Sequence, residues 1–200
     1  MDYEFEKQAM SDGFISVCGV DEAGRGPLAG PVCAAAVILP LDCEIEGLND
    51  SKKLSEKKRD ALYDIIKEKA VAYSIAMVDE KTIDEINILQ ATFKAMREAI
   101  DGLPVKPDLA LIDGNQKPQS GIEERTVVKG DAKSMSIAAA SVLAKVTRDR
   151  FMLELDEKYP EYQFKKHKGY GTKLHYEALE KYGVSPVHRV TFLKKLFDKG

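Results

Sequence analysis

Two short apolar runs on either side of a proline-bounded loop constrain the fold of this chain most strongly. The runs are "FISVCGVD", residues 14–21, and "VCAAAVIL", residues 32–39. Their length and β-branched content are typical of buried strands. Asp21 and Glu22 stand side by side at the end of the first run. Two adjacent acids are costly to place there unless something compensates their charge.

Three further strands are expected along the chain, at residues 71–79, 107–113 and 124–131. The last of them is expected to end in Gly130 and Asp131. Short loops or a single helix join the first three strands, which favours antiparallel pairing among some of them.

Helices are expected between and after these strands. Ser55, Ser134 and Ser185 stand where helices begin and can act as N-caps, with Pro186 in the first turn after Ser185. The order of strands and helices predicts an α/β fold with a mixed sheet and helices on its faces. The expected helices cover residues 56–70, 83–100, 134–159, 172–183 and 185–197.

A chain of 200 residues is expected to form one domain. We divide it into a core, residues 1–157, and a basic helical segment, residues 158–200, packed on that core as part of the same domain. The segment carries ten Lys or Arg and four Asp or Glu, although the whole chain has a net charge of −3. This asymmetry favours a polyanion partner, but a solvated helical tail fits the charge equally well.

The remaining composition points to the cytoplasm. No apolar run is long enough to span a membrane, and the acidic N-terminus does not resemble a signal peptide. Three cysteines without metal-type spacing suit a reducing compartment better than a disulfide framework.

Asp21, Asp113 and Asp131 share a local context, because each ends an expected strand. Acids gathered at one end of a sheet raise each other's pKa unless a cation lies among them. Ligands that are all oxygen select Mg²⁺ or Mn²⁺. Together with Glu22 they predict a site for phosphoryl transfer in which two ions activate water and stabilise the leaving oxygen. The alternative is that these acids only cap helices or begin turns.

The stretch "GRGPLA" also fits the dinucleotide-binding pattern G-x-G-x-x-A. That pattern requires a helix to begin at the glycines. Here Pro27 and Pro31 bracket the loop and a strand follows, so we reject this interpretation. The glycines still allow a ligand to approach the backbone, and Arg25 can contact phosphate.

The motif "GVDEAGRGPLAGPV" resembles the signature of the ribonuclease HII family, the type 2 ribonucleases H. The blocks "NDSKKLS", "LIDGN", "VKGDAKSMSIAAASVLAKVTRDR", "HKGYGTKLH" and "SPVHRVTF" extend the resemblance over nearly the whole chain. It implies a ribonuclease H-like five-stranded mixed sheet with a helical C-terminal segment. It also implies cleavage of RNA in RNA–DNA hybrids, and incision 5′ of single ribonucleotides in duplex DNA that leaves 3′-hydroxyl and 5′-phosphate ends.

The resemblance assigns roles residue by residue. It places the catalytic, metal-binding acids at Asp21, Glu22, Asp113 and Asp131, with two Mg²⁺ or Mn²⁺ ions in the catalytic complex. Its ribonucleotide-reading elements fall on Gly24, Arg25, Gly26 and Tyr170, although Tyr176 and Tyr182 lie nearby in the sequence. Reading a 2′-hydroxyl requires backbone within hydrogen-bond distance, and glycines beside Arg25 permit that approach.

Several other residues are candidates for substrate contact. Lys52 and Lys53 can grip a flanking phosphate or form a solvated loop. Ser141 and Lys145, spaced i, i+4, share a helix face and can reach phosphate or support the acids. Asp149 can support the four acids from behind or pair with Arg148 or Arg150, and the pairing is favoured. A strip of lysines with Tyr162 and Tyr170 interleaved can bind a duplex: Lys165, Lys166, Lys168 and Lys173. The three histidines, His167, His175 and His188, have no zinc-type spacing.

Two alternatives stay open beside a monomeric ribonuclease HII-like enzyme. One is a type 3 ribonuclease H, a family that carries an added N-terminal domain. The first strand is expected to begin near Phe14, which leaves no room for such a domain and argues against this alternative. The other is a non-catalytic module that binds RNA–DNA hybrids, against which the presence of all four acids argues.

Overall fold

A computed structural model describes residues 1–197, which form a five-stranded mixed sheet with the order β3-β2-β1-β4-β5. Strands β1, β2 and β3 pair antiparallel, whereas β4 and β5 join the other side of β1 in parallel. The expected α/β fold and the antiparallel pairing are therefore confirmed. The strands are β1 Val17–Ala23, β2 Val32–Ile38, β3 Ala72–Val78, β4 Leu109–Asp113 and β5 Glu123–Val127.

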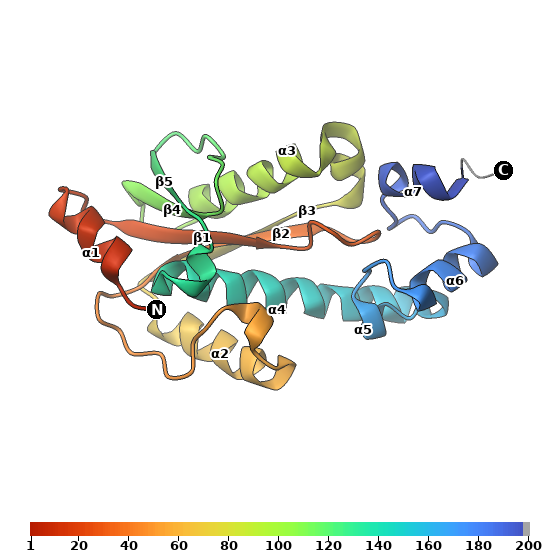
Figure 1. Cartoon of the computed structure of the whole chain (residues 1–200), viewed down its shortest axis with the longest axis horizontal. Helices are drawn as coiled ribbons and strands as arrows, with labels where there is room; N and C mark the ends of the chain where they lie inside the picture. The colour runs from red at the N-terminus through yellow and green to blue at the C-terminus, as the bar shows by residue number, and fades with distance from the viewer. Residues whose placement is uncertain (198–200) are drawn as a thin grey trace.

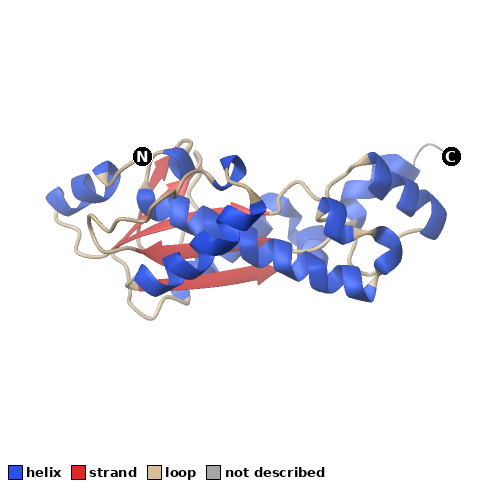
Figure 2. Cartoon of the chain, turned by 90° about the horizontal axis from the view of Figure 1, so that it is seen from below, coloured by secondary structure: helices blue, strands red, loops and turns tan. Residues whose placement is uncertain are grey.

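Helices cover both faces of the sheet, in three layers (Figures 1 and 2). α3, Glu80–Asp101, lies on one face and packs its apolar side against β1, β2 and β3. α4, Met135–Lys158, lies on the other face, and α2, Glu56–Lys69, packs against α4 from outside. Ser55 and Ser134 cap α2 and α4 as expected, each accepting a backbone N–H three residues on.

β1 and α4 approach each other unusually closely at Gly19. A Cβ on Gly19 would lie 2.2 Å from the carbonyl carbon of Ser136 and 2.3 Å from the amide nitrogen of Ile137. The absence of a side chain at Gly19 therefore sets the distance between the strand that carries two of the acids and the helix behind it.

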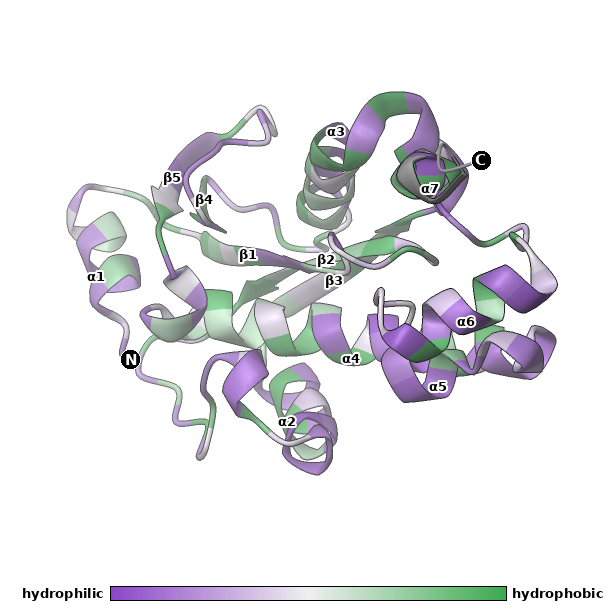
Figure 3. Ribbon diagram, turned by 45° about the vertical axis from the view of Figure 1, so that its right-hand side comes forward, coloured by the Kyte–Doolittle hydropathy of each residue, from purple (hydrophilic) through white to green (hydrophobic). Residues whose placement is uncertain are grey.

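The C-terminal segment lies beyond one end of the sheet (Figure 3). Its elements share an apolar cluster with the loop after β1, which contributes Leu28 and Ala29, and with the end of α4, which contributes Met152 and Leu155. This contact ties the segment to the loop that begins at Gly24. Its elements are a 3₁₀ turn Pro160–Tyr162, α5 Phe164–His167, α6 Lys173–Tyr182 and α7 Val190–Phe197. Residues 198–200, the end of the segment expected from the sequence, lie outside the described residues.

The structure corrects two expected element boundaries. β5 ends at Val127, and Gly130 and Asp131 lie in a 3₁₀ turn that follows Lys129, whose φ is 56°. The last helix begins at Val190 rather than at Ser185. Its first N–H groups are accepted by Asp84 of α3, at 2.9 Å from Val190 and 3.0 Å from Thr191. A cap supplied from another helix leaves no local signal in the sequence.

An N-terminal helix, α1 Glu4–Ser11, was not expected. Glu6 of this helix is buried and accepts hydrogen bonds from the Ser134 hydroxyl (2.6 Å) and the Ser136 N–H (3.0 Å). It therefore ties α1 to the first turn of α4. Of the helices in residues 1–197, none is long and apolar enough to cross a membrane.

Replacing Gly19 with Ala is expected to destabilise the fold by about 3 kcal/mol, because backbone rather than a flexible side chain must move. Gly26→Ala is the matched control, since its Cβ would meet only Tyr170, at 3.7 Å. That control is expected to change stability by less than about 0.5 kcal/mol. Urea unfolding measures both, and an equal effect of the two substitutions would contradict the close packing at Gly19.

Candidate active site

The carboxyl ends of β1 and β4 place two of the expected acids side by side. These strands are parallel and pair up to Val20 and Ile112, so Asp21 and Asp113 follow at the same edge of the sheet. Glu22 comes next on β1 and is half-buried, whereas Asp21 is 5 % exposed. The Glu22 N–H donates to Asp21 Oδ1 at 2.7 Å, which fixes the orientation of that carboxylate.

Asp131 reaches the same edge from the turn between β5 and α4. Asp113 Oδ1 accepts the N–H groups of Gly130 at 2.6 Å and of Asp131 at 3.2 Å. A Cβ on Gly130 would lie 2.6 Å from Ile137 Cδ1 and 3.2 Å from Asp113 Oδ1, so this turn has little room for a side chain there. The structure thus brings all four expected acids to one edge, two of them joined through the backbone.

Burial and mutual repulsion perturb this group of acids. Burial raises the pKa of Asp21 well above its usual value, and the charges of Glu22 and Asp113 raise it further. The pKa of Glu22 is also raised by burial, against the opposing effect of Arg25. Burial and the Asp113 charge raise the pKa of Asp131. The expectation from the sequence, that acids gathered at this edge raise each other's pKa, agrees with these directions.

Few cations compensate the acids. Lys52 Nζ lies 3.6 Å from Asp131 Oδ2, and Arg25 Nη1 lies 3.7 Å from Glu22 Oε1. Both cations are substantially exposed, so solvent screens them. Burial alone would lower the pKa of Lys52, but Asp131 and Asp21 outweigh it and the pKa is raised. The cluster therefore carries net negative charge in a poorly solvated place.

An all-carboxylate set with excess negative charge fits a hard divalent cation. Within residues 1–197 no three Asp, Glu, His or Cys side chains converge as a ready-made metal site. Asp113 instead uses Oδ1 to accept two backbone N–H groups. The oxygen ligands and the uncompensated negative charge nevertheless fit a divalent cation. Mg²⁺ in proteins commonly completes its coordination shell with water and substrate phosphate.

A cavity of about 240 Å³ opens beside Asp21 and Glu22. The Gly24–Gly26 loop, Tyr170 and Lys145 line the cavity together with these acids. Tyr170 is 41 % exposed, and Lys145 Nζ and Arg148 Cζ each lie 5.9 Å from the centroid of its ring. Tyr176 and Tyr182 do not line this cavity, which favours Tyr170 among the three tyrosines. The full lining is Asp21, Glu22, Ala23, Gly24, Arg25, Gly26, Ser51, Lys52, Lys145 and Tyr170.

The structure explains the glycine at position 24 differently from the sequence-based expectation, which was that it lets a ligand approach the backbone. Its φ is 93°, and a Cβ there would lie 2.1 Å from Nε of Arg148. Gly24 therefore makes room for a buried arginine rather than for an approaching ligand. A Cβ on Gly26 would meet Tyr170 at the ordinary distance of 3.7 Å, so access to the backbone is a reason for glycine only at Gly26.

Two fully buried arginines that the sequence analysis did not single out as site residues hold the loop after β1. Arg148 donates to the carbonyl oxygens of Pro31 (2.9 Å), Ala29 (3.0 Å) and Lys168 (2.9 Å). Burial lowers its pKa. Each of its hydrogen-bonded partners is a backbone carbonyl.

The expected pairing of Asp149 with a neighbouring arginine is wrong, since Asp149 pairs with Lys145 at 2.8 Å and Arg150 pairs with Asp60.

Arg189, in the C-terminal segment, also holds the loop after β1 through its backbone carbonyls. Its guanidinium donates to the carbonyl oxygens of Gly24 (2.6 Å), Arg25 (3.0 Å) and Gly30 (2.9 Å). Burial lowers its pKa to about 9. Because these carbonyls point at Arg189, the loop that lines the cavity is fixed from behind. The sequence offered one usable signal, an arginine inside the apolar stretch "SPVHRVTF".

Of the remaining candidates for substrate contact, some line the cavity and others do not. Lys52 and Lys145 line the cavity, whereas Lys53 is exposed in the same 3₁₀ turn, Ser51–Lys53, and does not line it. Ser141 is buried and donates to the Ser51 hydroxyl at 2.6 Å, so it supports that turn from behind.

The expected duplex-binding strip is wrong for Tyr162. Tyr162 is 3 % exposed and donates its hydroxyl to the Gly183 carbonyl. Its ring stacks on Phe164 inside the apolar cluster of the C-terminal segment. Tyr170 is the exposed aromatic residue of the expected pair.

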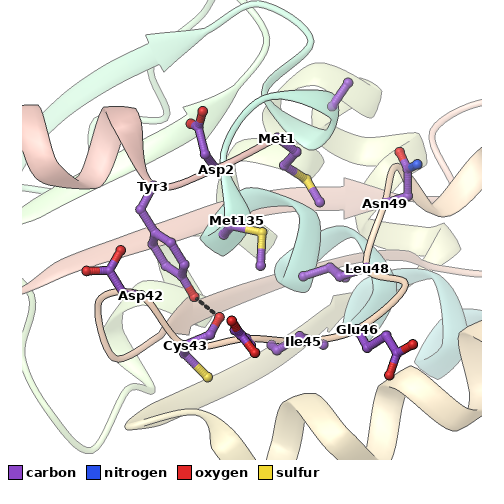
Figure 4. A pocket seen from close by; sticks show the side chains of 12 residues that line it. Met1, Asp2, Tyr3, Asp42, Cys43, Ile45, Glu46, Leu48, Asn49 and Met135 are labelled. Carbon is purple, nitrogen blue, oxygen red and sulfur yellow. Dashed lines mark hydrogen bonds between the residues drawn. The ribbon is translucent and has the colours of Figure 1, made fainter.

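A larger cavity, of about 770 Å³, lies near the N-terminus (Figure 4). It is lined by Met1, Tyr3, Cys43 and Met135 among others, and Tyr3 donates to the Cys43 carbonyl at 2.8 Å. None of the four acids lines it. The chemistry of the lining residues, rather than cavity size, therefore identifies the candidate active site.

Comparison with known proteins decides the family. A family model described as Ribonuclease HII matches residues 18–197. The chain belongs to the ribonuclease HII family. A ribonuclease HII of Caldicellulosiruptor bescii is 55% identical over 196 residues, which cover 98% of this chain and 95% of the relative. The enzyme is accordingly an endonuclease that hydrolyses RNA in RNA–DNA hybrids and depends on divalent metal.

Solved structures agree on the fold. Ribonuclease H2 from Pyrococcus horikoshii superposes with a TM-score of 0.75 at 29% identity, covering 93% of this chain and 100% of that one. Ribonuclease HII in its PCNA complex from Archaeoglobus fulgidus superposes with a TM-score of 0.73 at 27% identity, covering 88% and 94%. The family match favours the type 2 enzyme over the type 3 alternative.

Replacing Arg189 with Lys is expected to destabilise the protein by about 2–4 kcal/mol, because an ammonium cannot satisfy three diverging carbonyls. The control is Arg150→Lys, whose exposed partner is Asp60 and whose loss is expected to be below about 1 kcal/mol. Denaturant unfolding measures both. Equal, small losses would show that the loop does not depend on Arg189.

Replacing Asp21 with Asn is expected to raise the melting temperature in chelator by about 2–4 °C, the shift that about 1 kcal/mol produces in a chain of this size. The reason is that a buried, repelled charge is removed. Calorimetry of both proteins in chelator tests this. A clearly lower melting temperature for the variant would mean that the Asp21 charge is already well compensated.

Proposed function

We propose that Asp21, Glu22, Asp113 and Asp131 are the catalytic, metal-binding acids of this ribonuclease, and that it incises duplex DNA 5′ of single ribonucleotides. The observation that carries the proposal is the convergence of four acids with uncompensated charge beside a cavity lined by a glycine loop and a tyrosine. The products are a 3′-hydroxyl and a 5′-phosphate.

In this proposal the four acids would hold two Mg²⁺ or Mn²⁺ ions, and the bound ions would supply an activated water and neutralise charge on the phosphate. Asp21 is fixed by the Glu22 N–H and Asp113 by the N–H groups of the following turn. These bonds fix the orientation of the Asp21 and Asp113 carboxylates, although the four acids must still converge when the ions bind. Lys145 and Lys52 face the same cavity and neutralise the phosphate flanking the scissile bond.

The ribonucleotide is read from two sides of the cavity. The backbone of Gly24–Gly26 faces the sugar, with its carbonyls held from behind by Arg189. The Tyr170 phenol donates to the 2′-hydroxyl, and its ring packs on the next deoxyribose. A 2′-hydroxyl is the group that distinguishes RNA from DNA at one position.

The proposal extends to the substrate and to the state of the protein. The basic segment 158–200 contacts the duplex backbone as part of the same domain as the core, residues 1–157. We propose that the enzyme acts as a cytoplasmic monomer on RNA–DNA hybrids and on duplex DNA that contains ribonucleotides. Contacts from its lysines make binding weaken as salt rises.

The deciding experiment uses a labelled DNA duplex with one internal ribonucleotide, incubated with Mg²⁺, with Mn²⁺ or with chelator. Metal-dependent incision on the 5′ side of that ribonucleotide is the expected result. Cleavage restricted to long hybrids would contradict the single-ribonucleotide specificity, and cleavage in chelator would contradict the metal role of the acids.

Asp21→Asn is expected to lower kcat on this duplex by at least about 10²-fold, because several kcal/mol of charge stabilisation are lost. Binding of the hybrid is expected to survive, since phosphate contacts lie elsewhere. The exposed Asp101→Asn is the control and is expected to behave as wild type. Normal turnover of the Asp21 variant would remove this residue from the metal site.

Tyr170→Ala is expected to reduce incision at a lone ribonucleotide about tenfold, the value of one hydrogen bond together with ring packing. Affinity for the duplex as a whole is expected to fall less. Tyr182→Ala, outside the cavity, serves as the control. An equal loss of incision and of binding for the Tyr170 variant would make this tyrosine a general contact.

A further inference from the structure

Two buried histidines form a chain of hydrogen bonds that begins at Tyr170. His175 Nδ1 lies 2.9 Å from the Tyr170 carbonyl oxygen, and His175 Nε2 lies 2.9 Å from His188 Nε2. His188 Nδ1 accepts the Ser185 N–H at 3.0 Å. The histidine side chains are 0 % and 2 % exposed, so the chain is closed to solvent.

The partners at the two ends fix where each proton lies. A carbonyl oxygen only accepts, so His175 Nδ1 carries a hydrogen and its Nε2 accepts. A backbone N–H only donates, and the Ser185 hydroxyl, 2.7 Å from the same nitrogen, can donate as well. His188 Nδ1 therefore accepts and its Nε2 carries the hydrogen. The two assignments are made independently, and they meet as one donor and one acceptor at the shared hydrogen bond. All four ring nitrogens are therefore satisfied with both histidines neutral.

The same chain segment holds the other half of the ribonucleotide reader. Arg189, the residue after His188, donates to the carbonyls of Gly24 and Arg25. The backbone adds two further links to this loop, from Arg189 N–H to the Leu28 carbonyl and from Gly30 N–H to the Val187 carbonyl, each 2.8 Å. The Leu28 N–H in turn donates to the Gly169 carbonyl at 2.8 Å, next to Tyr170.

We propose that His175 and His188 are positioning residues that hold Tyr170 in register with the Gly24–Gly26 loop. The proposal rests on the proposed function, in which both elements read one ribonucleotide. His188 and Arg189 are adjacent, so one dipeptide fixes both elements: its histidine side chain reaches Tyr170 through His175, and its arginine side chain reaches the loop.

Packing alone does not explain these residues. The rings of His175 and His188 lie against Phe164, with centroids 5.7 and 5.8 Å away, in a cluster that aliphatic or aromatic carbon could fill. Burying four ring nitrogens costs free energy unless each has a partner. Here every partner is present, and one end of the chain is the backbone of a cavity residue.

The test compares two substitutions of His188 that differ by one methylene group. His188→Gln places an amide N–H₂ at about the position of Nε2 and can still donate to His175. His188→Asn carries its amide near the position of Nδ1 and cannot reach His175. kcat and KM are measured in saturating Mg²⁺ on a duplex with one embedded ribonucleotide. The inhibition constant of the same duplex without the ribonucleotide reports contacts that do not involve the 2′-hydroxyl.

His188→Asn is expected to lower kcat about fivefold to tenfold, the effect of one hydrogen bond, with KM and the inhibition constant within about twofold of wild type. His188→Gln is expected to stay within about twofold of wild type in all three. Equal losses in both variants, no loss in either, or a loss confined to KM and the inhibition constant would overturn the proposal.

Nitrogen-15 NMR of the wild-type imidazoles gives a second readout that needs no variant to fold. His175 protonated at Nδ1 and His188 protonated at Nε2 are expected, and the reverse tautomers would overturn the proposal.

Failure of the proposed function and failure of the positioning role give different results. A wild-type enzyme that does not incise at a single ribonucleotide contradicts the proposed function and with it this proposal. Normal incision with an insensitive His188→Asn contradicts only the positioning role.

Discussion

The rest of the site depends on negative charge that the fold gathers and does not neutralise. Parallel pairing of β1 and β4 sets Asp21 beside Asp113, and the 3₁₀ turn after β5 adds Asp131. Burial and repulsion raise the pKa of Asp21 and of Asp131, while the nearby cations are exposed. In the proposed function this uncompensated charge is what attracts a divalent cation and the phosphate that the cation carries.

Opposite the acids, the protein buries two positive charges whose hydrogen-bonded partners are carbonyls. Arg148 and Arg189 together hold six backbone carbonyls, five of them in the loop from Gly24 to Pro31. Each of the three nitrogens of each guanidinium donates to one of these carbonyls, which offsets part of the cost of burying the charge. This arrangement joins the C-terminal segment to the loop after β1. It also explains why a basic segment that the sequence suggests as a duplex contact is at the same time part of the cavity wall.

The sequence predicted most of what periodic apolar patterns and local caps determine. All five expected strands are present and the caps of α2 and α4 lie where the patterns placed them, but β5 ends at Val127 rather than at Asp131. Asp21 and Asp113 lie at one edge because strand ends meet there, whereas Asp131 reaches that edge from the turn after β5. The sequence did not predict contacts made across long separations in the chain. The Asp84 cap of α7 and the seating of Gly24 on Arg148 both depend on tertiary packing. The Lys145–Asp149 pair is different, because it is an i,i+4 contact within α4 that helical spacing could have indicated. Tyr162 was misplaced because a run of lysines begins three residues after it at Lys165, whereas its ring packs against Phe164 and His188.

The most direct test of the central claim is the melting temperature of the full chain as Mg²⁺ is titrated, with ionic strength held constant by NaCl. Binding to the folded state stabilises it by mass action. The account predicts a melting temperature that rises with the logarithm of Mg²⁺ concentration in the wild type and stays flat when Asp21 is Asn. A flat titration for the wild type, or an equal rise in both proteins, would contradict the claim that these acids form the metal site.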